Sequence, residues 1–256
     1  MNTAVIRYAF LDLLRSRFIV VYALLLFTCT MALFQLDNDS SKVMLSLLNI
    51  VLLVVPLVCV VFTTIHFYNS YEFIELMLAQ PINRIVVFMG EYLAVSSSLT
   101  IGFLLGVGLP LMIYGGGSAA IVLIITGTLL TLVFVSLAFL TSVLTRDKAK
   151  AIGCALMLWI YFSLIYDGFL LWIVYSFSDY PLEKVTLALI ALNPVDLARI
   201  ILLLKMDISA LMGYTGAFFQ EFFGSSLGLI FSSTSLFVWI SLPLYFAMRI
   251  FNKKDW

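Results

Sequence analysis

Few residues of this chain are of the types that carry out chemistry, and their spacing argues against catalysis. The sequence contains one histidine and three cysteines. Cys59 and His66 are the most plausible pair of metal ligands, but seven residues of helix separate them by roughly 10 Å, too far to share an ion held by bonds of about 2 Å. No HExxH or GxxxxGK[ST] motif occurs. We therefore expect no catalytic residue, no metal site and no ATP site in this chain.

Two carboxylates, Asp167 and Glu91, lie within or beside long apolar runs. An ionisable residue at membrane depth is a functional candidate by default. Asp167 is close enough to one end of its run, and Glu91 to the start of its own, for either to be hydrated. The sequence therefore leaves the roles of both carboxylates open.

The composition is that of a membrane protein with several spans. Hydrophobic residues make up 63% of the chain and charged residues 11%, and the mean hydropathy is +1.14. The net charge of zero gives no sign of a nucleic-acid partner. Six apolar runs are long enough to cross a bilayer, which takes about 20 residues of helix. They cover residues 18–36, 43–67, 86–114, 119–144, 151–177 and 227–248. We predict an all-α membrane protein with six transmembrane helices.

Two flanking features refine this prediction. Residues 1–17 mix arginines with apolar residues in the pattern of an interfacial helix at the N-terminus. In the third span, Gly102, Gly106 and Gly108 permit close helix contact, but such spacing is too common in membrane helices to indicate dimerisation by itself.

Residues 68–84 form a short amphipathic segment between the second and third spans. Asn69 and Glu72 have capping-box spacing, and Glu72 suits the positive end of a helix dipole. Gln80 and Pro81 are expected to end the helix, with Pro81 in the first turn of the next one. A helix here places Phe73, Leu76, Met77 and Gln80 on one face and Glu72, Glu75 and Ala79 on the other. Such a helix either receives a partner outside the membrane or lies in the lipid interface.

Residues 178–226 separate the fifth and sixth spans, and polar residues interrupt their most apolar part. Asp196 and Arg199 each cost about 2.5–3.5 kcal/mol near a helix centre, so a seventh span is not expected. We predict two short external helices, re-entrant or interfacial. Asn193 would cap the second, with Pro194 in its first turn and Asp196 paired with Arg199 at i,i+3 spacing.

Basic residues indicate which side of the membrane is which. Six spans place both termini on the same side as residues 68–84 and 145–150. This side would hold ten of the fourteen lysines and arginines and is cytoplasmic by the positive-inside rule. The ten residues are Arg7, Arg15, Arg17, Arg84, Arg146, Lys148, Lys150, Arg249, Lys253 and Lys254. Residues 249–256 would then be a cytoplasmic tail, and residues 178–226 would lie outside.

The chain as a whole resembles the permease of a type-2 ABC transporter, or ABC-2 permease. Three strings, FIELMLAQPINR at 73–84, LNPVDLARI at 192–200 and LMGYTGAFFQEFFG at 211–224, resemble the permease subunit of the transporter that supports copper-site maturation of nitrous oxide reductase. The resemblance implies a homodimer in the bacterial inner membrane. It also implies two copies of a separate ATPase subunit that binds ATP and Mg²⁺, and an external β-helical copper-handling protein.

The resemblance also assigns residues to the two partners. Residues 68–84 would be the cytoplasmic coupling helix, contacting the ATPase through Asn69, Glu72, Phe73, Glu75, Leu76, Met77, Gln80, Pro81 and Arg84. The external partner would contact Asn193, Pro194, Asp196, Arg199, Tyr214, Phe218, Phe219 and Glu221.

Three functions remain open at this point. Because the chain lacks a convincing set of copper ligands, we favour a mechanical relay of ATP-driven motion to the external partner over a copper channel. A general ABC-2 exporter of a lipid, peptide or drug is the first alternative, with phenylalanines lining an apolar path. The second is a scaffold or membrane enzyme without an ATPase, in which Asp167 and Glu91 would be the acid–base groups.

Overall fold

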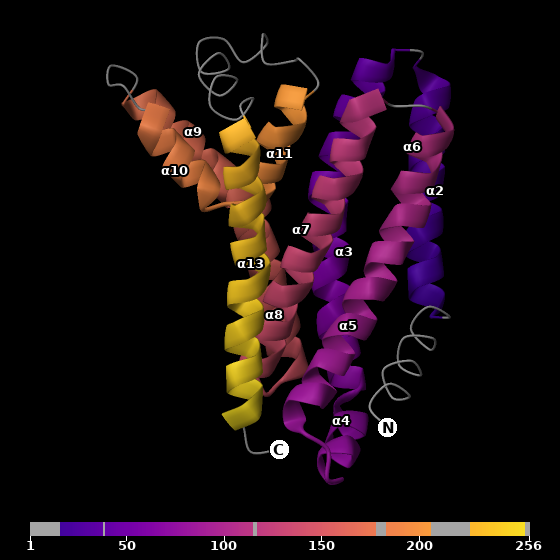
Figure 1. Ribbon diagram of the computed structural model, residues 1–256, viewed down its shortest axis with the longest axis vertical. Coiled ribbons are helices and arrows are strands. Elements are labelled where there is room, and N and C mark those ends of the chain that lie inside the picture. Colours follow the sequence, from indigo (N-terminus) through magenta and orange to yellow (C-terminus); the bar gives the residue numbers. More distant parts are fainter. Residues whose placement is uncertain (1–15, 38, 115–116, 178–182, 206–225, 254–256) are drawn as a thin grey trace.

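The computed structural model describes residues 16–37, 39–114, 117–177, 183–205 and 226–253, and these are almost entirely helical (Figure 1). The helices are α2 (Arg17–Leu36), α3 (Ser40–Asn69), α4 (Tyr71–Leu78), α5 (Arg84–Phe103), η1 (Leu104–Gly108), α6 (Leu109–Tyr114), α7 (Gly117–Leu144), α8 (Lys148–Ile160), η2 (Tyr161–Ile165), α9 (Tyr166–Ser176), α10 (Glu183–Ala191), α11 (Pro194–Lys205) and α13 (Ser226–Lys253). The segments η1 and η2 are single π-helical turns within longer helices.

Among the described residues, six helices are long and apolar enough to cross a membrane. They are α2, α3, the continuous run α5–η1–α6, α7, the continuous run α8–η2–α9, and α13. The predicted all-α fold with six spans is therefore confirmed. The expected interfacial helix at residues 1–17 lies almost wholly outside the described residues.

Helices α10 and α11 form a bent pair, with an angle of 113° between them, instead of a straight seventh span. Asn193 at the bend is fully buried, and α11 packs against α7, α13 and α3. The pair therefore enters the bundle, as a re-entrant segment would, and does not lie flat on its surface.

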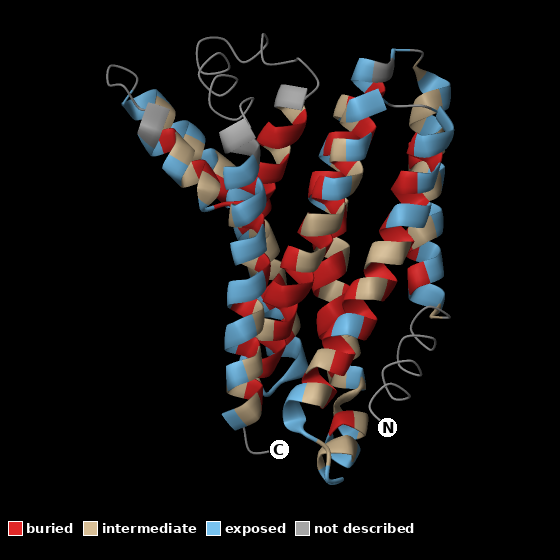
Figure 2. Cartoon of the chain, viewed as in Figure 1, coloured by how far each residue is buried: buried red, intermediate tan, exposed pale blue. Residues whose placement is uncertain are grey.

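Helix α7 forms the centre of the bundle and packs against α3, α13, α11 and α5. Most of its inward-facing side chains are buried (Figure 2). Its hydroxyl groups donate back to its own backbone, as in the 2.9 Å bond from Thr131 to the Gly127 carbonyl and the 2.7 Å bond from Ser142 to the Ala138 carbonyl. Small hydroxyl residues therefore allow close helix packing without leaving polar atoms unpaired.

Gly102 and Gly106 of the third span pack against α2 of the same chain, whereas Gly108 faces Ile124 of α7. A Cβ added at Gly106 would lie 2.6 Å from the Leu26 Cβ and 3.0 Å from the Ala23 carbonyl oxygen, and one at Gly102 would lie 3.1 Å from the Tyr22 ring. The small-residue spacing noted in the sequence therefore serves a contact within the chain.

The two ends of the bundle differ in what they carry (Figure 1). The start of α2, the end of α13 and the short helix α4 lie at one end, and the α10–α11 pair lies towards the other. This arrangement separates two candidate sites, one around α4 and one around the α10–α11 bend.

Candidate functional site

Helix α4 is short and is fixed by one deeply buried side chain. Ile74 is 1% exposed and joins the hydrophobic core, while Phe73 and Met77 are half-buried. Glu72 and Leu76 point outward, and 65% of Leu76 is exposed. The other exposed residues of this segment are Glu75, Ala79 and Gln80.

The orientation of α4 differs from the sequence prediction. The sequence grouped Leu76 with Phe73 and Met77, but the structure places Leu76 on the exposed side with Glu72 and Glu75. The burial of Ile74 sets the rotation of the helix and brings Leu76 out. The exposed face is therefore both acidic and apolar, a combination suited to a protein surface that offers basic and apolar groups.

The ends of α4 and α5 also differ from the prediction. Asn69 is the last residue of α3, and its side-chain oxygen accepts a 2.8 Å hydrogen bond from the Lys148 ammonium. Ser70 occupies the N-cap position of α4 without a side-chain cap bond. The predicted capping box is therefore wrong, because Lys148 at the start of α8 engages the Asn69 oxygen.

Pro81 is not in the first turn of the following helix. Helix α5 starts at Arg84, where the Asn83 side chain accepts a 3.0 Å bond from the Ile85 amide. Asparagine is among the most favourable N-cap residues, and Asn83 sets the start of α5 three residues after Pro81. The residues from Gln80 to Ile82 instead form a turn, closed by a 2.7 Å bond from the Ile82 amide to the Gln80 carbonyl.

Further hydrogen bonds connect the helices on either side of α4 to the rest of the bundle. The Tyr68 hydroxyl lies 2.8 Å from the Thr145 hydroxyl and donates to the Thr145 carbonyl at 3.1 Å, which joins the end of α3 to the end of α7. The Arg84 guanidinium donates to the Asn252 carbonyl at 3.2 Å, which joins the start of α5 to the end of α13. Displacement of α4 would therefore be felt by α3, α5 and the helices bonded to them.

A polar cluster lies beside α4 at the same end of the bundle. The His66 Nε2 lies 3.1 Å from a Glu91 carboxylate oxygen and 3.3 Å from the Ser70 hydroxyl. Glu91 is 6% exposed, so His66 supplies a hydrogen-bond partner to a buried carboxylate. The sequence treated these residues separately, although an acid at the start of one span and a histidine at the end of the preceding span could have suggested the pair.

The second site is the bend between α10 and α11, where the side chain of Asn193 makes three hydrogen bonds. Its side-chain oxygen accepts from the Val195 amide at 3.0 Å, which caps α11 as predicted. Its amide group donates to the Phe162 carbonyl at 2.9 Å and to an Asp196 carboxylate oxygen at 2.8 Å. Phe162 lies in η2, so a π-helical turn of the fifth span holds the bend.

Arg199 joins α11 to the fifth span. Its Nη1 donates to Asp167 at 2.6 Å and to Asp196 at 3.2 Å. The second contact confirms the predicted i,i+3 pair, but the sequence analysis missed Asp167 as a partner. The cost of an isolated charge at membrane depth was the available signal, because it predicts that Asp167 has a basic partner elsewhere in the chain.

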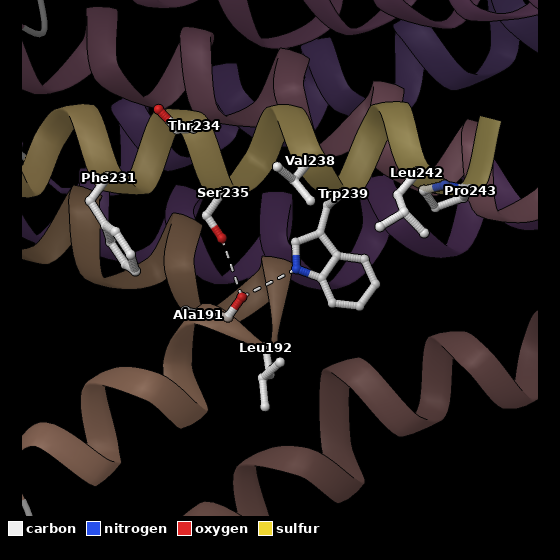
Figure 3. A pocket seen from close by; sticks show the side chains of 9 residues that line it. All are labelled: Ala191, Leu192, Phe231, Thr234, Ser235, Val238, Trp239, Leu242 and Pro243. Atoms are coloured by element: carbon white, nitrogen blue, oxygen red, sulfur yellow. Dashed lines mark hydrogen bonds between the residues drawn. The ribbon is translucent and has the colours of Figure 1, made fainter. Parts of the chain in front are cut away.

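The bend is also bonded to α13 and α9. The Ala191 carbonyl accepts from the Ser235 hydroxyl at 3.3 Å and from the Trp239 indole at 3.2 Å (Figure 3). The Tyr166 hydroxyl donates to the Leu189 carbonyl at 2.6 Å. A pocket of about 540 Å³, lined mainly by apolar side chains of α13, adjoins the bend.

Comparison with known proteins identifies the family. Residues 72–256 match the family model described as ABC-2 family transporter protein. The chain belongs to the ABC-2 transporter family. It is the membrane subunit of an ABC transporter, so ATP hydrolysis belongs to separate ATP-binding subunits with which this ABC-2 permease assembles.

Two curated relatives carry the same name, probable ABC transporter permease protein NosY. The protein from Pseudomonas aeruginosa is 32% identical over 148 residues, which are 54% of each chain. The protein from Stutzerimonas stutzeri is 26% identical over 200 residues, which are 70% of this chain and 67% of the relative. The ABC-2 permease therefore spans about half the length of the first relative and about two thirds of the second.

The structure brings the predicted site residues together in two groups. Residues from Asn69 to Arg84 of the ABC-2 permease lie on or beside α4. Asn193, Pro194 and Asp196 are buried within the chain, which leaves them no surface for an external partner in this conformation. Arg199 is partly exposed, and the other four residues predicted to contact that partner, Tyr214, Phe218, Phe219 and Glu221, lie outside the described residues.

Metal ligands do not converge in the described part of the ABC-2 permease. No group of three or more His, Cys, Asp or Glu side chains there could hold a metal ion. Cys59 is fully buried, and His66 faces Glu91 and Ser70. What the arrangement provides is two polar junctions, one beside α4 and one at the α10–α11 bend.

Proposed function

We propose that this ABC-2 permease supports copper-site maturation of nitrous oxide reductase by relaying ATP-driven motion to an external copper-handling partner. The name of the two relatives and the three sequence strings described above support this assignment. In this proposal the permease is a homodimer in the bacterial inner membrane, bound to two ATPase subunits that hold ATP and Mg²⁺.

The observation that carries the relay is the path of α3. This helix runs without interruption from residue 40 to residue 69 and contacts α4, α8 and α11. Its last residue receives the bond from Lys148, and its other half lies against the pocket that contains Asp167 and Arg199. Motion imposed on α4 therefore has a continuous helical route to the α10–α11 bend.

Charge supports an assignment of α4 to the cytoplasm. The helix ends beside α4 carry Arg84, Lys148 and Lys253, and the loop before α8 carries Arg146. The positive-inside rule then places α4 and both termini in the cytoplasm and the α10–α11 pair on the outer side. The ATPase subunits would meet the exposed Glu72, Glu75 and Leu76 face.

The site chemistry supports a relay more than a copper channel. Copper sites in proteins use thiolate, thioether or imidazole ligands that converge on the ion. The junction at the α10–α11 bend contains carboxylates, an amide and one guanidinium instead, and the cluster beside α4 offers one imidazole, that of His66. Copper would accordingly be cargo of the external partner.

A general ABC-2 exporter is the second candidate function, and one observation favours it. The apolar pocket beside the α10–α11 bend has a volume of about 540 Å³ and is lined by Leu192, Phe231 and Leu242. A pocket of this size and lining suits an acyl chain or another apolar substrate.

The test is reversal of charge on α4 by Glu72→Lys and Glu75→Lys together. Both side chains are exposed, so insertion and stability should change little. We expect binding of the ATPase subunits in nanodiscs to weaken at least about tenfold, because like charges would face each other across the contact. The control is Gln35→Lys, at the end of α2 that lies away from α4. This variant should leave ATPase binding unchanged.

The copper content of nitrous oxide reductase in cells that depend on this chain gives the second readout. A copper-poor reductase with the charge-reversed permease supports the maturation role. Normal ATPase binding by the variant would refute the coupling role of α4. Loss of ATPase binding together with a fully copper-loaded reductase would refute the maturation role and favour the general exporter.

A further inference from the structure

A second pocket, of about 450 Å³, lies between α3, the η2–α9 segment and α11. Its polar groups come from all three elements and are Asn49, Ser163, Asp167 and Arg199. The remaining lining is apolar and includes Leu53 of α3. The pocket therefore combines a charged, hydrogen-bonding side with a wall suited to hydrocarbon.

Ser163 is the first sign that this pocket is built for a ligand. The residue is 6% exposed, yet its hydroxyl has no hydrogen-bond partner among the described residues. Buried hydroxyls are nearly always paired, because an unpaired one costs about 1–3 kcal/mol. The side chain lines the pocket, so a ligand there can supply the missing partner.

The exposure of the ion pair is a second, independent sign. The Asp167 and Arg199 side chains are 28% and 31% exposed, although both belong to segments packed inside the bundle. Both residues line the pocket, so their exposed atoms face its interior. Charged atoms facing a cavity at this depth require water or a polar ligand.

The charges and donors of the pocket select the chemistry of that ligand. Arg199 already donates to Asp167 and Asp196, which makes it a poor site for an added anion. Asp196 does not line the pocket, because its carboxylate oxygens accept from Asn193 and Arg199, so Asp167 is the carboxylate that faces a ligand. Asp167, Ser163 and Asn49 offer oxygen acceptors, but three oxygens are too few for a hard metal cation, which takes about six ligands.

We propose that this pocket binds a molecule that has a primary ammonium group on an apolar chain. The ammonium group donates hydrogen bonds to Asp167 and Ser163. The apolar chain lies along the Leu53 side of the pocket. This assignment does not rest on the maturation role, because it follows from the lining of the pocket alone.

The pocket can be reached from one side of the membrane. Asp167 lies nine residues before the end of α9 at Ser176, and Asn49 lies nine residues after the start of α3 at Ser40. Both are therefore about 13 Å along the helix axis from those ends. An amphiphile from the adjacent leaflet can enter at this depth without crossing the membrane.

The test uses the full chain in nanodiscs and quenching of tryptophan fluorescence by 11-bromoundecylamine. Trp159 reports on the site, because its indole donates to the Leu53 carbonyl at 3.1 Å. We expect saturable quenching by the amine at a concentration at least about tenfold lower than for 11-bromoundecanol. The Trp159→Phe variant should lose the saturable part of the signal.

Variants then separate the contributions of the lining residues. We expect Asp167→Asn to reduce the preference for the amine at least about tenfold and Ser163→Ala to reduce it about threefold, since a charged and a neutral hydrogen bond are lost respectively. Asp37→Asn, which removes a carboxylate at the end of α2, is the matched control and should preserve the preference. 11-Bromoundecyltrimethylammonium, which has the charge but no N–H donor, should bind more weakly than the amine.

Equal quenching by amine and alcohol would overturn the proposal, and so would an unchanged amine preference in Asp167→Asn. Circular dichroism checks that each variant is folded. If Asp167→Asn does not fold, the Ser163→Ala variant and the trimethylammonium probe decide, and binding of that probe equal to the amine would refute hydrogen-bonded recognition of the ammonium group.

Discussion

Replacing Arg199 by methionine is expected to destabilise the permease by about 3 kcal/mol. Methionine has an unbranched apolar side chain similar in length to the aliphatic part of arginine. The substitution therefore removes the two charge-assisted hydrogen bonds of Arg199, at 2.6 and 3.2 Å. Each such bond contributes about 1.5–3 kcal/mol, and breaking a buried ion pair by removing one partner costs about 3–5 kcal/mol. Because nearly a third of the Arg199 and Asp167 side chains is exposed, the lower end of this range applies.

The destabilisation arises mainly from the carboxylates that remain. Without Arg199, Asp167 and Asp196 have no cation, and Asp196 is only 5% exposed. Asp167→Asn leaves the Asp196–Arg199 pair in place and is expected to cost about 1 kcal/mol. The triple variant Arg199→Met, Asp167→Asn, Asp196→Asn should regain most of the lost stability, because no uncompensated charge is left.

The assay is unfolding in mixed micelles titrated with sodium dodecyl sulfate, with helix content followed by circular dichroism. Arg146→Met is the control for loss of an exposed cation and should stay within about 0.5 kcal/mol of the parent protein. An Arg199→Met variant as stable as this control would refute the assignment of Arg199 as the bridge between α11 and the fifth span. A triple variant no more stable than Arg199→Met would show that the carboxylates are not the source of the cost.

Two further variants test packing and polar contacts elsewhere, with the same unfolding assay. Gly106→Ala should destabilise the protein by about 1–3 kcal/mol, because its Cβ would lie 2.6 Å from that of Leu26. The control Gly153→Ala, with no atom within 4 Å of the added Cβ, should be neutral or stabilising by up to about 1 kcal/mol. Equal losses of stability in the two variants would contradict the close contact between Gly106 and α2. His66→Ala should destabilise the protein by about 1–3 kcal/mol, because it leaves the buried Glu91 without its 3.1 Å partner. His66→Gln retains a hydrogen-bond donor and should recover part of this loss. Unchanged stability in His66→Ala would indicate that the pair is not formed.

The spans could be predicted from the sequence because hydropathy over about 20 residues determines them almost alone. Local features with short-range causes were also predictable, such as the Asn193 cap and the Asp196–Arg199 pair. Both depend on residues two or three positions apart in one helix.

Features that depend on distant residues could not be predicted in the same way. Asn69 was expected to cap α4, but Lys148, which is distant in sequence, engages its side chain. The partner of Asp167 lies in another helix and becomes evident only once the α10–α11 pair is seen to bend into the bundle. Which of several possible partners a side chain bonds to depends on the tertiary structure, and the hydrophobic periodicity of the sequence does not predict it.

The uninterrupted course of α3 has a mechanical consequence. Its 30 residues include Pro56 near the middle and, if the two halves move as one body, make it a lever arm of roughly 45 Å, at 1.5 Å of rise per residue. A tilt of about 5° at the α4 end would sweep the far end through about 4 Å, more than the whole length of a typical hydrogen bond. Asn49 and Leu53 would then shift relative to Asp167 and Arg199, and the polar pocket would open or close. Angular displacements small enough to preserve the core of the bundle would thus suffice to switch the contacts on its opposite side.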